Sequence, residues 1–167
     1  MAVRSPTINV MASAALKAAR ALKRDFGEVE QLQVSVKGPG DFVSTADLHA
    51  ERTLKTELMR ARPGYGILLE EGGATEGSDP HHRWIVDPLD GTTNFLHAIP
   101  HFAISIALER DGEVVAGLVY EPTRDEMFAE RGAPKTNVPV TAFPMGHMNV
   151  ITSWAIDAKG EIKNVYA

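Results

Sequence analysis

Two stretches of the chain place apolar residues at the three- and four-residue spacing of an amphipathic helix. The first covers residues 7–26, and Gly27 is its expected end. The second runs from about Thr45 to Arg62, where a Pro-Gly pair follows. An apolar face on each helix indicates that both pack on a common core.

Short runs of alternating or continuous apolar residues predict the strands of a sheet. They are residues 32–36, 66–70, 83–87, 102–109, 113–120 and 126–130. A turn is expected at residues 37–40, a loop at 72–80 and a hairpin at Arg110-Asp111-Gly112. The pattern predicts an α+β fold in which two N-terminal helices pack on an antiparallel sheet in layers.

The pattern changes after about residue 132. Prolines then punctuate a stretch with little periodicity, and apolar residues between 148 and 167 suggest a short hairpin. We therefore expect one domain over residues 1–132 and an atypical tail over residues 133–167.

Composition narrows the class of protein. A formal charge of −5 argues against a nucleic-acid partner, because such partners require clustered Lys and Arg. The absence of cysteine excludes a disulfide framework and a thiolate zinc site, and it fits a cytoplasmic location. Neither a secretory signal nor a bilayer-spanning apolar run is recognisable, so no membrane association is expected.

Carboxylates follow directly after two of the predicted strands. Glu70 and Glu71 end one strand, Asp87 ends the next, and Asp90 lies shortly beyond it. Acidic groups gathered at the rim of a core repel one another, and a divalent cation is the usual solution. Because the candidate ligands are hard oxygens without Cys or a His cluster, Mg²⁺ or Mn²⁺ is favoured over zinc.

Hydrogen-bond donors follow these carboxylates in the sequence. Gly91 turns the chain, and Thr92, Thr93 and Asn94 supply hydroxyl and backbone N–H groups at a predicted helix start, where anions bind. Metal-assisted hydrolysis of a phosphate ester needs metal ligands and phosphate donors close together. Each piece alone has a plainer interpretation: a surface Glu pair, an Asp-Pro turn, a helix cap. The six histidines are interpreted as surface loop residues.

The segment from Trp84 to Phe95, WIVDPLDGTTNF, resembles the first signature of the inositol monophosphatase family. The segment from Gly40 to Asp47 and the pair Glu70-Glu71 resemble two further motifs of that family. The resemblance covers residues from about 7 to about 132. It implies the first half of the αβαβα sandwich of the sugar phosphatases.

The resemblance also implies roles for individual residues. The implied metal ligands are Glu70, Asp87, Asp90 and the carbonyl group of Leu89, and the implied phosphate-binding residues are Gly91, Thr92 and Thr93. Glu70, Asp90 and Thr92 would be catalytic, with Glu70 and Thr92 activating the attacking water. Asp41 resembles a residue near a further, weaker metal, and Glu71 and Asp47 resemble carboxylates behind the ligands or, for Asp47, at a helix start.

By the same resemblance, we expect two or three Mg²⁺ ions, with Mn²⁺ as a substitute and Li⁺ as an inhibitor. The substrate would be a small phosphate monoester such as inositol 1-phosphate, and the protein would be a homodimer.

The second half of the chain leaves an alternative open. The family's Trp-Asp-x-Ala-Ala-Gly motif, whose Asp completes the metal site, is not found, and Trp154 to Asp157 matches it poorly. A truncated or rearranged gene product, a short variant and an error in the sequence would each account for this. Besides a phosphatase, we therefore consider a catalytically impaired or non-catalytic relative that retains metal or phosphate binding, and an ordinary sheet domain with surface acids.

Overall fold

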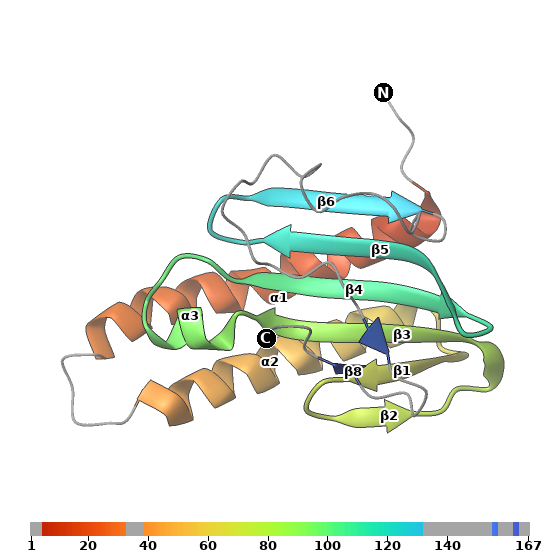
Figure 1. Ribbon diagram of the computed structural model, residues 1–167, viewed down its shortest axis with the longest axis horizontal. Coiled ribbons are helices and arrows are strands. Elements are labelled where there is room, and N and C mark those ends of the chain that lie inside the picture. Colours follow the sequence, from red (N-terminus) through yellow and green to blue (C-terminus); the bar gives the residue numbers. More distant parts are fainter. Residues whose placement is uncertain (1–4, 33–38, 132–154, 157–161, 164–167) are drawn as a thin grey trace. The chain divides into compact units, whose positions relative to one another are not determined.

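The structure is a computed structural model that describes residues 5–32, 39–131, 155–156 and 162–163 (Figure 1). The chain divides into two compact units, Met1–Ala133 and Pro134–Ala167. In the second unit, strands β7 (Ala155–Ile156) and β8 (Ile162–Lys163) pair antiparallel. The candidate site lies in the first unit.

Helix α1 spans Pro6–Leu32 and is longer than predicted. It continues past Gly27 because the side chain of Val29 is fully buried, and this burial offsets the cost of about 1 kcal/mol for a glycine within a helix. Leu32 therefore belongs to α1 and not to the expected strand over residues 32–36. The rest of that segment lies outside the described residues.

Helix α2 spans Pro39–Ala61, so it begins before the expected Thr45 and includes part of the expected turn. Proline fits the first turn of a helix, because the N–H group that it lacks has no partner there. The earlier start places Asp47 inside the helix and not at its beginning.

The first unit contains a six-stranded sheet in the order β2-β1-β3-β4-β5-β6 (Figure 1). The strands are β1 (Tyr65–Leu69), β2 (Gly73–Thr75), β3 (Asp79–Asp90), β4 (Ala103–Arg110), β5 (Glu113–Glu121) and β6 (Glu126–Arg131), and the short helix α3 (Thr92–Leu96) follows β3. Helix α3 begins where the sequence predicted a helix start.

The sheet is mixed, which corrects the prediction of a purely antiparallel one. Strands β1 and β3 are parallel, whereas the other neighbours are antiparallel. The predicted loop over residues 72–80 contains β2 and the start of β3. Because β2 reverses the chain once, the following strand returns in the direction of β1.

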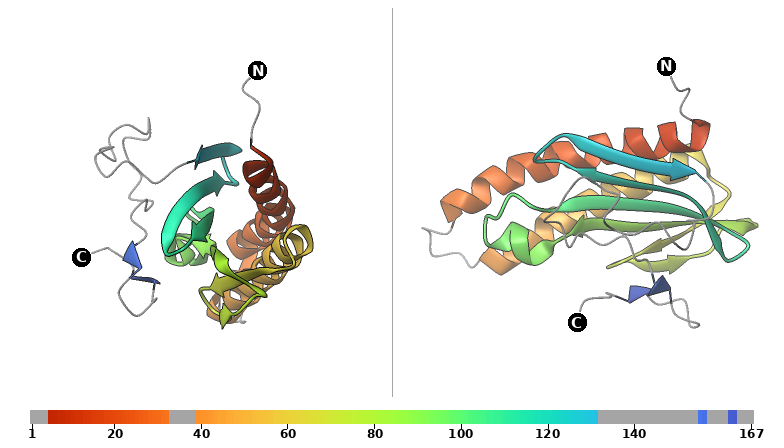
Figure 2. Two further views of the ribbon diagram at one scale, coloured as in Figure 1. Left: turned by 90° about the vertical axis from the view of Figure 1, so that its right-hand side faces the viewer. Right: turned by 45° about the horizontal axis from the view of Figure 1, so that its top comes forward.

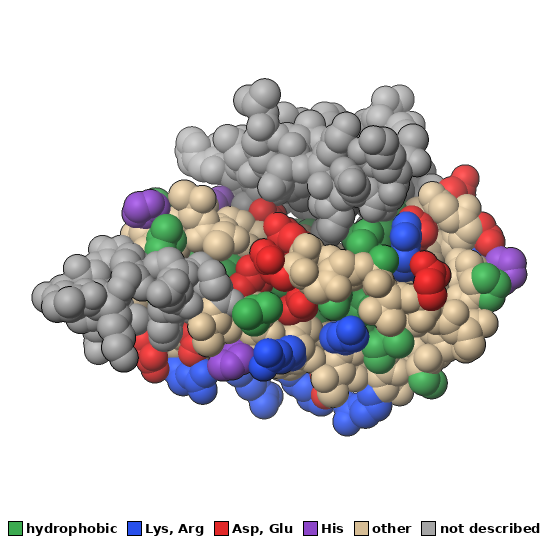
Figure 3. All heavy atoms as spheres, turned by 90° about the horizontal axis from the view of Figure 1, so that it is seen from below, with side chains coloured by type: hydrophobic (Ala, Val, Ile, Leu, Met, Phe, Trp, Pro, Cys, Tyr) green, Lys and Arg blue, Asp and Glu red, His purple; other side chains and the backbone are tan. Residues whose placement is uncertain are grey.

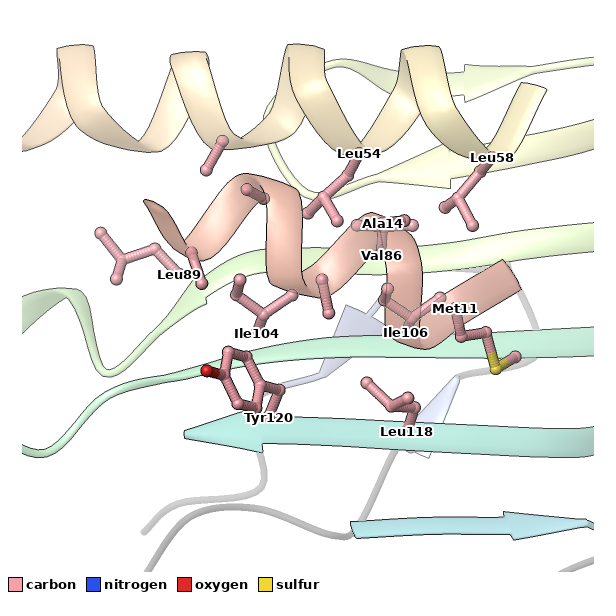
Figure 4. Close-up of a cluster of buried hydrophobic side chains, with 14 of the residues drawn as sticks. Met11, Ala14, Leu54, Leu58, Val86, Leu89, Ile104, Ile106, Leu118 and Tyr120 are labelled. Atoms are coloured by element: carbon pink, nitrogen blue, oxygen red, sulfur yellow. The ribbon is translucent and has the colours of Figure 1, made fainter. Parts of the chain in front are cut away.

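Both long helices lie on one face of the sheet, as the end-on view in Figure 2 shows. Figure 4 shows the core between these layers, to which α1, α2 and the central strands contribute. Its labelled members are Met11, Ala14, Leu54, Leu58, Val86, Leu89, Ile104, Ile106, Leu118 and Tyr120. Each fully buried large side chain contributes about 1.5–3 kcal/mol, so this interface holds the layered α+β fold together. None of the described helices is apolar over a length sufficient to cross a membrane.

Candidate active site

The parallel pairing of β1 with β3 brings two predicted ligands together. Leu69 pairs with Val86, so Glu70, which follows the end of β1, lies beside Asp87 of β3. After burial, the charge of the neighbouring Glu70 is the largest cause of the raised pKa of Asp87.

An irregularity in β3 brings Asp90 to the same face of the sheet as Asp87. Residues three apart on a regular strand point to opposite faces. In β3, however, Asp87 pairs with Ser105 and Asp90 pairs with Ala103, so β3 contains one residue more than β4 in this interval. The extra residue acts as a bulge and restores a common direction for the two aspartates.

Helix α2 contributes two buried carboxylates. The resemblance placed Asp47 behind the ligands or at a helix start, whereas the sequence analysis gave Glu51 no role. Asp47 and Glu51 are each 6% exposed. With Leu54 and Leu58 they follow the four-three-four spacing of a core-facing helix stripe, and this was the signal that could have revealed them. The Oδ1 atom of Asp47 is buried and has no hydrogen-bond partner among the described residues.

The pKa values of these carboxyl groups are raised because the groups are buried close to one another. Burial, followed by the charges of Glu70, Glu71 and Glu51, raises the pKa of Asp47 to about 7. Burial and the charge of Glu70 raise the pKa of Asp90 to about 6. Burial raises the pKa of Asp87 well above its usual range, and the charges of Glu70 and Asp90 add to this effect.

No Lys or Arg in the described part of the chain forms an ion pair with these carboxylates. Figure 3 shows acidic side chains gathered on the face that carries α2 and β2, with Lys and Arg along one edge of the view. Among the described residues, no three Asp, Glu or His side chains are already arranged to hold a metal ion. The donor set nevertheless fits a hard divalent cation, because it consists of oxygens, lacks counter-charges and includes the unpartnered Oδ1 of Asp47.

The turn after Asp90 is shaped by a glycine in the left-handed region. Gly91 has φ of 90°, and a Cβ atom there would lie 3.0 Å from the carbonyl oxygen of His101. The amide of Asn94 donates to the same His101 oxygen at 2.8 Å, which holds α3 against the chain that leads into β4. Thr92 and Thr93 are exposed at the start of α3.

The remaining predicted residues occupy different positions. The Leu89 carbonyl accepts a hydrogen bond from the Thr92 hydroxyl at 2.9 Å, so these two residues are in contact. Glu70 and Glu71 are exposed in the turn between β1 and β2. The backbone of Asp41 lies in α2, and its side chain lies outside the described residues.

The inositol monophosphatase family model matches residues 4–158, and the chain therefore belongs to this family. It is 65% identical over 130 residues to an inositol-1-monophosphatase of Mesorhizobium japonicum, covering 77% of this chain and 49% of that protein. It is 41% identical over 129 residues to the Nus factor SuhB of Vibrio cholerae, covering 77% of this chain and 48% of that protein.

Among solved structures, the extragenic suppressor protein suhB of Bartonella henselae matches with a TM-score of 0.68 and 57% identity, over 76% of this chain and 49% of that one. The chain thus spans about half the length of these relatives. The family match runs past residue 132, where we expected the resemblance to end, so the boundary of the tail stays a prediction.

Proposed function

We propose that the protein is a metal-dependent phosphomonoesterase that hydrolyses inositol 1-phosphate or a related sugar or polyol phosphate. The observation that carries this proposal is the group of buried acids without counter-charges directly beside a turn rich in hydroxyl and N–H groups. Membership of the inositol monophosphatase family supports it.

In this proposal, the ligands of two or three Mg²⁺ ions are Glu70, Asp87, Asp90 and the Leu89 carbonyl, with Asp41 near the weakest ion. Mn²⁺ would serve as a substitute. When bound, such ions neutralise the phosphate and lower the pKa of water.

The chain's own groups would then orient the reactants. The backbone N–H groups of Gly91, Thr92 and Thr93 would bind the phosphate oxygens. The Thr92 hydroxyl donates its proton to the Leu89 carbonyl, so its oxygen can accept a hydrogen bond from the attacking water. Thr92 would thus orient this water, and the Glu70 carboxylate would accept its proton. Asp47 and Glu71 would act from behind the ligands through their charge.

The test is Mg²⁺-dependent release of phosphate from inositol 1-phosphate, with fructose 1,6-bisphosphate, nucleotide 3′-phosphates and histidinol phosphate as further substrates. Asp90→Asn should abolish release. Asp79→Asn is the matched control, because it changes the same residue type at the other end of β3 and should leave release intact. Absence of release from every substrate would contradict the proposal, and inhibition by Li⁺ would strengthen it.

A non-catalytic role is the second candidate, favoured by the relatives named Nus factor SuhB at about 40% identity. In that case the domain would bind a metal ion or phosphate and act through association with other molecules. Tight binding of Mg²⁺ or phosphate without hydrolysis would distinguish this function from the first. From the family resemblance, we further infer a homodimer, which sedimentation analysis would test. From the absence of cysteine, we infer a cytoplasmic location.

A further inference from the structure

The carboxylate of Glu51 contacts the turn that carries Glu70. Its Oε2 atom accepts hydrogen bonds from the backbone N–H groups of Glu71, at 3.1 Å, and Gly72, at 3.2 Å. Glu51 is 6% exposed, although it belongs to α2 and the turn joins β1 to β2. A single buried oxygen therefore connects the helix layer to the turn.

We infer that Glu51 is a positioning residue, which fixes the turn between β1 and β2 and thereby holds the Glu70 side chain against Asp87. The effect of Glu51 on metal binding rests on the proposed function. Its effect on the position of the turn is independent of that function. The resemblance to the inositol monophosphatase family assigns no role to Glu51.

The turn between β1 and β2 is closed by the pairing of Leu69 with Gly73. It consists of the residues between Leu69, where β1 ends, and Gly73, where β2 begins with φ of 65°. Both acidic side chains of this turn, Glu70 and Glu71, are exposed, and each contributes to the charge near Asp47. Repulsion between these acidic groups would push the turn outward. The hydrogen bonds to the charged Glu51 carboxylate oppose this movement, and such bonds are about twice as strong as neutral ones.

The packing at Gly72 supports the same role. A Cβ atom at this position would lie 2.9 Å from the Oε1 atom of Glu51 and 2.9 Å from a methyl carbon of Leu69. The carboxylate thus lies against Gly72, where a residue larger than glycine would displace it. Glu51 acts on the site through backbone groups, which distinguishes it from a ligand.

Two substitutions separate positioning from charge. Glu51→Gln keeps a carbonyl oxygen that can accept both N–H groups but removes the charge. Glu51→Met keeps the length of the side chain and removes the acceptor. Gly72→Ala displaces the carboxylate from the other side and keeps Glu51 itself unchanged, so it serves if Glu51→Met does not fold.

The first measurement uses NMR to monitor amide hydrogen exchange at Glu71 and Gly72 in metal-free protein. We expect both amides to be protected in the wild type and in Glu51→Gln. We expect exchange at least about 10-fold faster in Glu51→Met and Gly72→Ala, because local opening sets the rate once the acceptor is lost. Unprotected amides in the wild type, or unchanged rates in both Glu51→Met and Gly72→Ala, would overturn the inference.

The second measurement is the affinity for Mg²⁺ by calorimetry. We expect Glu51→Met to bind Mg²⁺ about 10–100-fold more weakly, as is usual when a group that orients a ligand is lost, and Glu51→Gln to restore most of the affinity. Equal losses in both variants would show that Glu51 is a ligand and would overturn the inference. If the wild type bound no Mg²⁺, the proposed function would fail, while the exchange rates would still decide the role of Glu51.

Discussion

The two ends of strand β3 carry similar acidic residues in opposite electrostatic settings. At its start, Asp79 accepts a hydrogen bond from the backbone N–H of His81 at 2.8 Å, and its other oxygen lies 2.8 Å from the ring of His82. The His81 hydrogen bond, assisted by His82, holds the pKa of Asp79 below its usual range. At the other end, burial and neighbouring carboxylates raise the pKa values of Asp87 and Asp90.

Neighbouring strands extend this contrast. Near the start of β3, Arg83 forms an ion pair with Glu109 at 3.0 Å, and the His81 ring lies 2.6 Å from Asp111. The chain supplies its own counter-charges there. At the end of β3 the described residues supply none, and buried charges are stable only when paired or bound to a metal. The first end is therefore complete within the protein, whereas we propose that the second binds a cation from solution.

Removing the acids at the end of β3 should have the largest effect. We expect Asp87→Asn combined with Asp90→Asn to weaken Mg²⁺ binding by more than about 100-fold, because losing ligands should cost more than losing the groups that orient them. Without metal, the same protein should be more stable than the wild type, since repulsion is relieved. Thermal unfolding with and without Mg²⁺ measures both effects.

Asp79→Asn is the control at the start of β3 and should leave the Mg²⁺-induced shift in Tm unchanged. A normal Mg²⁺-induced shift in the double variant would show that the end of β3 is not a metal site.

Two glycines with positive φ provide the next comparison. Gly91→Ala and Gly112→Ala each introduce a side chain in the left-handed region, at a cost of about 1–2 kcal/mol. A Cβ atom at Gly112 meets no atom within 4 Å, whereas at Gly91 it lies 3.0 Å from the His101 oxygen. Denaturant unfolding should therefore show a larger loss of stability for Gly91→Ala, and phosphate affinity should fall in that variant alone. Equal losses in both variants would contradict the proposed importance of this contact.

The pH dependence should have opposite signs at the two ends of β3. Asp47 and Asp90 have pKa values of about 7 and about 6 in the folded protein, above the usual 3.8. Their contribution to stability is thus present below pH 4 and is lost as the pH rises through 6 and 7. Asp79, whose pKa is lowered, contributes above its unfolded pKa, and this contribution is lost as the pH falls through the folded value.

The groups with raised pKa values, Asp47 and Asp90, together set how strongly stability should change with pH. For each proton, the free energy of unfolding falls by at most about 1.4 kcal/mol per pH unit, reduced by solvent screening. Urea unfolding in chelator between pH 4 and 8 measures the slope. Excess Mg²⁺ should remove the decline above pH 5, and a decline that persists in Mg²⁺ would count against metal binding at these groups.

The smallest effect is expected from Asp111→Asn. The side chains of His81 and Asp111 are 65% and 63% exposed, and exposed ion pairs contribute little to stability. The raised pKa of His81, caused mainly by its hydrogen bond to Asp111, should return toward its usual value. NMR titration of His81 measures this change, and Mg²⁺ affinity should not change.

The sequence predicted the features that depend on local patterns. Apolar periodicity located both long helices, and the apolar run before Glu70 located the end of β1. Strand β3 continues past its predicted end at Asp87 to Asp90, because its pairing with β4 extends to Ala103. The turn at Gly91 and the helix start at Thr92 also followed from local chemistry. These features depend on neighbouring residues along the chain, which the sequence shows directly.

Other features depend on contacts between distant segments. Strand β2 is too short and too exposed for an apolar pattern, so the parallel direction of β3 was not foreseen. The bulge between Asp87 and Asp90 is defined only by the register with β4. Glu51 looked like an ordinary polar position of a helix, and only the resemblance gave Asp47 a role, because their burial arises only when α2 packs beside the ends of β1 and β3.

The most direct test of the metal site is calorimetric titration of Mg²⁺ at pH 6 in two buffers with different enthalpies of ionisation. Binding of the ion requires deprotonated ligands. The account predicts Mg²⁺ binding accompanied by proton release in the wild type, and neither binding nor release when Asp87→Asn and Asp90→Asn are combined. The account would be contradicted if the wild type bound no Mg²⁺. It would also be contradicted if Mg²⁺ bound without proton release and this binding persisted in the double variant.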